Sequence, residues 1–165
     1  MKIVLAGAAM VGVVVFAIIS GLHFHLGLDL DTFHDKLRGS FFTGFLTLGG
    51  FLFSLKTFIV IKMKEGLYDH PNYRKNYAEK MALLKGPVTI FTPLRNLTDL
   101  LFAAIVSSLT TSLLQVTLGL SSRWWAVGIC LASIGVTLVF LSVALFQIKS
   151  NLDEWFKYLD EDAKK

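Results

Sequence analysis

Four long runs of apolar residues constrain this chain more than any other feature of its sequence. A helix that crosses the roughly 30 Å hydrocarbon core of a bilayer needs about 20 apolar residues, because each residue adds about 1.5 Å. The four runs reach that length and cover residues 3–22, 41–61, 97–120 and 124–148. We therefore predict four transmembrane helices in a single domain that extends over residues 1–165.

Composition supports a lipid environment and excludes several other classes of protein. Hydrophobic residues make up 54% of the chain and charged residues 17%, and the mean hydropathy is +0.62. A disordered chain would have low hydrophobicity and high charge, and a soluble domain of this size has too small a core for so much apolar side chain. The single cysteine excludes a disulfide framework and a thiolate-cluster metal site.

Lysine and arginine are distributed unevenly over the predicted connections. Residues 62–96 hold seven of them, the tail 149–165 holds four, and Lys2 precedes the first run. The other two connections together carry three. Because positive charge favours the cytoplasmic side, we predict that both termini and residues 62–96 are cytoplasmic. We expect a multi-pass protein of a plasma or bacterial inner membrane.

Two cytoplasmic segments have the pattern of helices outside the membrane. Asp69-His70-Pro71 is typical of a helix start and Gly86-Pro87 of a helix end. The tail has apolar residues on one face and opposite charges four residues apart, so we expect the fourth span to continue as an amphipathic helix. This side is too short and too close to the membrane to suggest nucleic acid. Its predicted contacts for anionic lipid or a protein partner are Arg74, Lys75, Lys80 and Trp155.

Lys56 interrupts the second apolar run and is the most unusual position in the sequence. A charge inside a span costs about 2.5–3.5 kcal/mol on insertion scales, which makes it a candidate for function. One lysine from each subunit of a homo-oligomer would form a ring that favours anions. Alternatively, its side chain extends to the interface near Lys62, about 9 Å away along the helix. Asp99 has a comparable depth in the third run, where it either pairs with Lys56 or stabilises its own helix start.

A stripe of polar side chains follows one face of the third run. Its members fall within about 140° of arc when successive residues turn by about 100°. One interpretation is a hydrated pathway, and the other is hydrogen bonding between packed helices. The stripe consists of Ser107, Ser108, Thr111, Ser112 and Gln115.

Bulky and small apolar residues also form patterns. Phe51 and Leu55 share a face of the second run and are candidates for a hydrophobic gate or for lipid contact. Ala8 with Gly12, and Gly128 with Ala132, are spaced four apart, which predicts close approach of helices within or between subunits.

Three histidines and three aspartates fall in or beside the first outer connection. Imidazole and carboxylate groups suit zinc or another divalent ion, although their spacing matches no compact metal motif. Ordinary interfacial histidines are the other interpretation. Residues 31–37 in the same connection are predicted as a short amphipathic turn. The candidate ligands are His23, His25 and His34, with Asp29, Asp31 and Asp35 nearby.

These patterns predict an all-α membrane protein, a four-helix bundle with cytoplasmic helical extensions. One subunit has too few helices to enclose a wide pathway, so we expect a homo-oligomer. The first hypothesis for its function is a homo-oligomeric channel or pore that favours anions, lined by the second span or by the polar stripe. The second is a non-conducting subunit or scaffold that docks a partner or anionic lipid through residues 62–96 and the tail. The third is a small metal transporter or membrane enzyme that uses the outer histidines. We predict no cofactor, and the lack of a recognisable catalytic motif argues against an enzyme.

Overall fold

The computed structural model describes residues 2–26, 30–84, 91–121 and 123–162, and these ranges are helical apart from short turns. Four of the helices, α1, α2, α4 and α5, are long and apolar enough to cross a membrane. The elements in chain order are α1 (Lys2–Leu26), α2 (Leu30–Met63), the π-helix η1 (Lys64–Tyr68), α3 (Pro71–Leu84), α4 (Thr92–Val116), the 3-10 helix η2 (Leu118–Leu120) and α5 (Trp124–Asp162).

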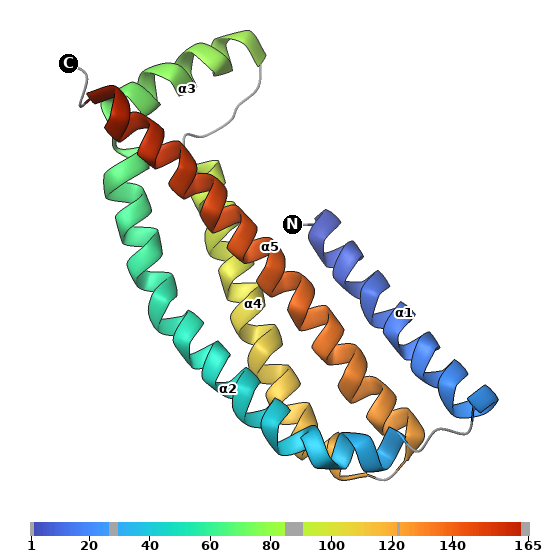
Figure 1. The fold of residues 1–165 in the computed structure, drawn as a ribbon. Helices are drawn as coiled ribbons and strands as arrows, with labels where there is room; N and C mark the ends of the chain where they lie inside the picture. Colours follow the sequence, from blue (N-terminus) through green and yellow to red (C-terminus); the bar gives the residue numbers. More distant parts are fainter. Residues whose placement is uncertain (1, 27–29, 85–90, 122, 163–165) are drawn as a thin grey trace.

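The long helices pack as antiparallel neighbours in the spatial order α2, α4, α5, α1 (Figure 1). α4 is central and has the most buried span, whereas α1 packs mainly against α5. The start of α1, the helix α3 and the end of α5 lie toward one end of the bundle, here called the α3 end (Figure 1). The opposite end, with η2 and the start of α2, is called the η2 end. A chain that crossed a membrane four times would need this alternation of helix directions. The cytoplasmic location of the α3 end stays a prediction.

Two of the helices extend beyond the predicted spans. α5 continues without a break to Asp162, which confirms the predicted extension of the fourth span. α2 begins at Leu30, so residues 31–37 form its first turns and the prediction of a separate surface turn is wrong. No proline interrupts residues 30–63, and the helix therefore continues through this stretch.

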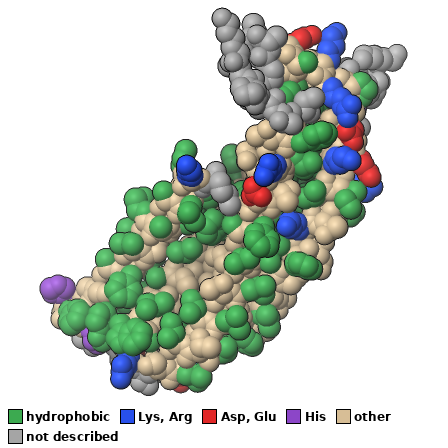
Figure 2. All heavy atoms as spheres, turned by 180° about the vertical axis from the view of Figure 1, so that it is seen from behind, with side chains coloured by type: hydrophobic (Ala, Val, Ile, Leu, Met, Phe, Trp, Pro, Cys, Tyr) green, Lys and Arg blue, Asp and Glu red, His purple; other side chains and the backbone are tan. Residues whose placement is uncertain are grey.

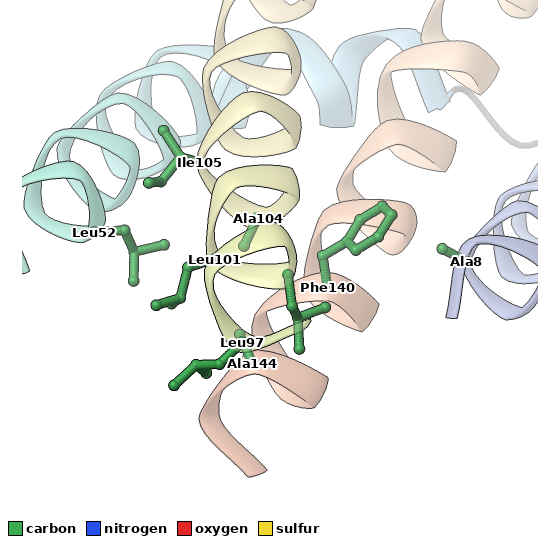
Figure 3. Close-up of a cluster of buried hydrophobic side chains, with 9 residues drawn as sticks. Ala8, Leu52, Leu97, Leu101, Ala104, Ile105, Phe140 and Ala144 are labelled. Carbon is green, nitrogen blue, oxygen red and sulfur yellow. The ribbon is translucent and has the colours of Figure 1, made fainter. Parts of the chain in front are cut away.

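An apolar cluster joins α4 to its neighbours toward the α3 end (Figure 3). Leu97, Leu101 and Ala104 of α4 are 0% exposed. Leu52 of α2 and Phe140 of α5 pack against them from either side (Figure 3). In lipid this contact is stabilised by van der Waals packing, because lipid tails are as apolar as leucine side chains.

Glycines bring α1 and α5 close together. A Cβ added at Gly12 would lie 2.8 Å from Cγ2 of Val136, and one added at Gly128 would lie 2.9 Å from Cε2 of Phe16. The predicted close approach at these small residues is therefore confirmed, and it joins the first and fourth spans of one subunit.

The outside of the long helices is largely apolar. Figure 2 shows hydrophobic side chains along the bundle, while charged side chains gather toward the α3 end. Ile3, Met10 and Phe146 are among the large apolar residues that lie on the surface. A surface of this kind fits contact with lipid or with other apolar helices.

Candidate functional site

The polar stripe of α4 lies inside the bundle, where its α2 side bonds to the backbone of α2. The Ser108 hydroxyl donates to the carbonyl oxygen of Phe45 at 2.8 Å. The Ser112 hydroxyl donates to the carbonyl oxygen of Phe42 at 2.9 Å. Both serines are 0% exposed. Their hydroxyls therefore connect two packed helices, as the second interpretation of the stripe proposed.

The other side of the stripe bonds to α5. The hydroxyl oxygens of Thr111 and Thr137 lie 2.8 Å apart, and those of Ser107 and Thr137 lie 2.7 Å apart. Thr137 is fully buried. Thr137 could not be recognised from the sequence, because one threonine in an apolar run carries no signal until its register with α4 is known.

His34 of α2 and Gln115 of α4 form another fully buried polar contact between helices. Nε2 of His34 lies 2.8 Å from Oε1 of Gln115, and the two residues are 1% and 0% exposed. The Gln115 amide nitrogen donates to the carbonyl oxygen of Cys130 at 3.3 Å, which directs Oε1 toward His34. Since Oε1 can only accept, Nε2–H of His34 is the donor in this hydrogen bond.

A cavity of about 260 Å³ lies beside His34 at the η2 end. Asp35 and Arg38 line it, and they form an ion pair of 3.1 Å. Arg38 also donates to the carbonyl oxygen of Gly119 at 3.0 Å. A Cβ on Gly119 would lie 3.0 Å from Cε1 of His34, so glycine allows α2 to approach the α4–α5 turn closely. Asp31 and Lys36 also line the cavity, while the charged groups of Asp35 and Arg38 are bonded to each other and, through Arg38, to the backbone.

The predicted metal ligands are not assembled into a site. Within residues 2–26, 30–84, 91–121 and 123–162, no group of three or more His, Cys, Asp or Glu side chains is placed to hold a metal ion. His34 is bonded to Gln115. His23 stacks on Trp124 with ring centroids 5.5 Å apart, and His25 is exposed. Asp29 lies outside the described residues.

Lys56 lies over an aromatic ring and is not paired with Asp99. Its Nζ is 5.0 Å from the ring centroid of Phe102 in α4, a cation–π contact. Asp99 is exposed, and these two described residues form no ion pair with each other. Phe51 is 60% exposed and Leu55 is half-buried. Phe51 therefore faces the surroundings of the subunit.

Polar and apolar contacts divide the interior of the bundle along its length. The bonds of the stripe occupy its η2 half, whereas the apolar cluster around Leu97 and Leu101 occupies its α3 half. A hydrated path through the described interior of one subunit would have to cross the cluster and break the bonds of the stripe. In the described part of the chain, packed and hydrogen-bonded side chains occupy the interior of the bundle.

A platform of aromatic residues covers the α3 end. In it, Trp155 of α5 lies against Gly66 of η1, where an added Cβ would be 2.7 Å from Cε2 of the indole. Around this contact, Met63, Tyr68 and Leu94 are buried together. The amide of Asp69 donates to the carbonyl oxygen of residue 64 at 2.9 Å, the bond that closes the π-helical turn. The predicted contact residue Trp155 thus packs against η1 of the same chain and is half-buried.

Tyr68 is the centre of this platform. Burial raises the pKa of Tyr68 from 10.0 to about 12, and the nearby Glu154 and Tyr77 add to the effect. The rings of Tyr68 and Tyr73 meet edge to face at 5.1 Å, and those of Tyr73 and Tyr77 stack at 5.8 Å. These contacts attach the first half of α3 to η1, and α3 lies across the end of the bundle (Figure 1).

The predicted basic contacts have different surroundings. Arg74 is exposed and pairs with Asp69 at 2.6 Å, whereas Lys75 is exposed and has no ion pair with another described residue. Lys80 belongs to α3, but its side chain lies outside the described part. Lys64, Arg95 and Lys149 are likewise exposed at this end and unpaired within the described ranges.

Comparison of the chain with known protein families, with curated proteins and with solved structures gives no match. The class of the protein therefore follows from its own features: an all-helical chain with four helices long and apolar enough for membrane spans.

Proposed function

We propose that this chain is an integral membrane subunit that does not conduct ions and that presents its α3 end to anionic lipid. The proposal rests mainly on the burial and the hydrogen bonding of the polar stripe. Ser108, Thr111, Ser112 and Gln115 are 0–1% exposed and hydrogen-bonded to neighbouring helices. Side chains used in this way hold a bundle together and offer no surface to a hydrated ion.

The α3 end supports the lipid part of the proposal. Residues 62–96 carry a clear excess of positive charge, which favours the cytoplasmic side of a membrane. The exposed Lys75 belongs to α3, the helix that lies across the bundle end (Figure 1). Lys64 of η1, Arg95 of α4 and Lys149 of α5 are also exposed. Each basic residue near an anionic surface contributes about 1 kcal/mol of attraction.

A channel formed between subunits is the second candidate function, and the surface of α2 favours it. Phe51 is exposed there, and Lys56 lies nearby with its ammonium group on Phe102. In an oligomer that places α2 around a central axis, these side chains would form the apolar gate and the cationic ring of the first hypothesis.

A flux assay separates the two candidates. The purified chain is reconstituted into liposomes under potassium and chloride gradients, with a known ionophore as positive control. We expect both fluxes to equal those of protein-free liposomes. A chloride flux that Lys56→Glu reduces would establish the channel and refute the non-conducting subunit.

Lipid binding is tested in mixed micelles by titration with phosphatidylglycerol. We expect Lys64→Glu and Lys75→Glu each to weaken binding at least about fivefold, because each removes a positive charge that contributes about 1 kcal/mol and adds a negative one. Lys36→Glu is the matched control, because it makes the same change at an exposed position at the η2 end. Equal effects of all three variants, or no salt dependence, would contradict a lipid site at the α3 end.

A further inference from the structure

Two contacts define how α2 and α4 are aligned. Ser108 of α4 bonds to the backbone of Phe45 in α2. A Cβ on Gly49 of α2 would lie 2.9 Å from Cδ2 of Leu109 in α4, so these two positions cross closely. Because the helices are antiparallel, moving toward the α3 end means rising residue numbers in α2 and falling residue numbers in α4.

This alignment places Lys56 and Asp99 at one depth. Counting from the two contacts, Lys56 lies level with residues 97–102 of α4. The contact between its ammonium group and Phe102 agrees with that count. Asp99 falls inside this interval, three residues from Phe102 and therefore on the same side of the helix. The two opposite charges thus occur at the same level on one outer face of the subunit.

Neither charge is neutralised within the described part of the subunit. Asp99 is exposed, Phe102 is 57% exposed, and Lys56 is half-buried. No ion pair joins Lys56 or Asp99 to another described residue. A charge in the apolar part of a span is costly when it is left without a partner. A partner that supplied both a carboxylate and an ammonium at this depth would remove the cost for both.

An apolar groove of about 460 Å³ begins at the same place. It extends from Phe102 toward the η2 end, between Val106 and Thr110 of α4 and Ser133 and Val136 of α5. The small side chains in its lining allow the close approach of another helix. On α2, Phe53 is 69% exposed and lies three residues from Lys56 on its η2 side.

We propose that a second copy of this chain docks on this face to form a parallel dimer. In that dimer Lys56 of each subunit pairs with Asp99 of the other, and Phe53 enters the groove between α4 and α5 of the other subunit. A two-fold axis along the membrane normal keeps equal residues at equal depth, so both ion pairs form together. A lipid tail would fill the groove, but it carries no ammonium and carboxylate at this level.

The proposal uses the proposed function only in taking the chain as inserted in a membrane. Dimer formation is measured by energy transfer between two differently labelled populations in liposomes. Lys56→Asp leaves two carboxylates in each subunit, and Asp99→Lys leaves two ammonium groups. We expect each variant alone to dimerise at least about a hundredfold more weakly than the unmodified chain, because like charges then meet twice.

Combining the two single variants in one sample shows whether the Lys56–Asp99 ion pair forms between two subunits or within one. When Lys56→Asp and Asp99→Lys are co-expressed, each heterodimer again contains two opposite-charge pairs, and we expect dimerisation to return. The double variant should also dimerise as a homodimer. If the double variant recovers but the mixture does not, the pair lies within one subunit and the proposal is wrong.

Two further variants test whether a loss of dimerisation is specific to this face of the chain. Phe53→Ala leaves both charges in place and should weaken the dimer, while Lys36→Asp makes the same charge change outside the face and should have no effect. Circular dichroism checks the helix content of each variant. A monomeric unmodified chain, or dimers that none of these variants weakens, would overturn the proposal and leave lipid as the occupant of the groove. The lipid test at Lys64 and Lys75 is independent of either outcome.

Discussion

The hydrogen bond between His34 and Gln115 offers a direct test of the buried polar stripe. The perturbation is a double-mutant cycle of His34→Leu, Gln115→Leu and the combined variant. Both side chains are almost fully buried and lie 2.8 Å apart. Leucine is close in volume to either residue and cannot form hydrogen bonds. The cycle therefore isolates the polar contact between α2 and α4.

The expected magnitudes follow from which groups each variant leaves without a partner. His34→Leu removes the donor to Oε1 of Gln115, and Gln115→Leu removes the acceptor for Nε2 of His34. A buried polar group without its partner costs about 1–3 kcal/mol, whereas a hydrogen bond between membrane helices contributes about 0.6 kcal/mol and at most about 1.7. We expect each single variant to lower the free energy of unfolding by about 1–3 kcal/mol.

The combined variant leaves neither partner of the bond behind. The decrease in its free energy of unfolding should therefore be smaller, by about 1–2 kcal/mol, than the sum of the decreases in the two single variants. Unfolding is measured by titration with sodium dodecyl sulfate in lipid–detergent micelles, followed by circular dichroism. Thr117→Val is the control, because the Thr117 hydroxyl is exposed and bonds to the carbonyl oxygen of Leu113 in its own helix. Strictly additive losses would show that the two residues do not interact and would refute the proposed geometry.

Three further predictions concern packing and ionisation. Gly66→Ala should destabilise the α3 end by about 1–3 kcal/mol and increase the exposure of Trp155, seen as a red shift of its fluorescence, because the added methyl overlaps the indole. Gly12→Ile should separate α1 from α5 at Val136 and speed proteolysis of α1; unchanged cleavage would contradict the close approach. Because the pKa of Tyr68 is raised to about 12, the unfolded state loses this proton first, so stability should fall between pH 10 and 12 and Tyr68→Phe should abolish that part of the fall. In absorbance titrations, one of the four tyrosines should ionise late in the folded chain only.

The fold was more predictable than the site. Helix α3 begins at Pro71 as predicted from Asp69-His70-Pro71, because the cue is local and a proline fits the first turn of a helix. The start of α2 at Leu30 was missed, because the polar residues that follow suggested a surface turn. The burial of His34 among them depends on α4, because Gln115 accepts a hydrogen bond from its imidazole.

The contacts at the α3 end could not be predicted from local sequence patterns either. Gly66 and Trp155 are far apart in sequence, and nothing local shows that the indole requires a residue without a Cβ. The sequence made Trp155 a candidate contact for lipid or a partner, and the structure adds that it packs against the Met63–Tyr68 cluster and is half-buried. The position of Trp155 on the apolar face of the tail could have indicated that it packs against another element, but not which residue it contacts.

The sequence by itself determined that the chain has four helices long and apolar enough for membrane spans, because helix length and side-chain polarity are properties of continuous segments. Only the tertiary structure decided what the polar residues in those helices do. Ser108 and Gln115 have the same spacing whether they line water or bond to a neighbour, and the choice depends on which helix lies against them. That neighbour is set by packing between segments far apart in the chain, which no local pattern records.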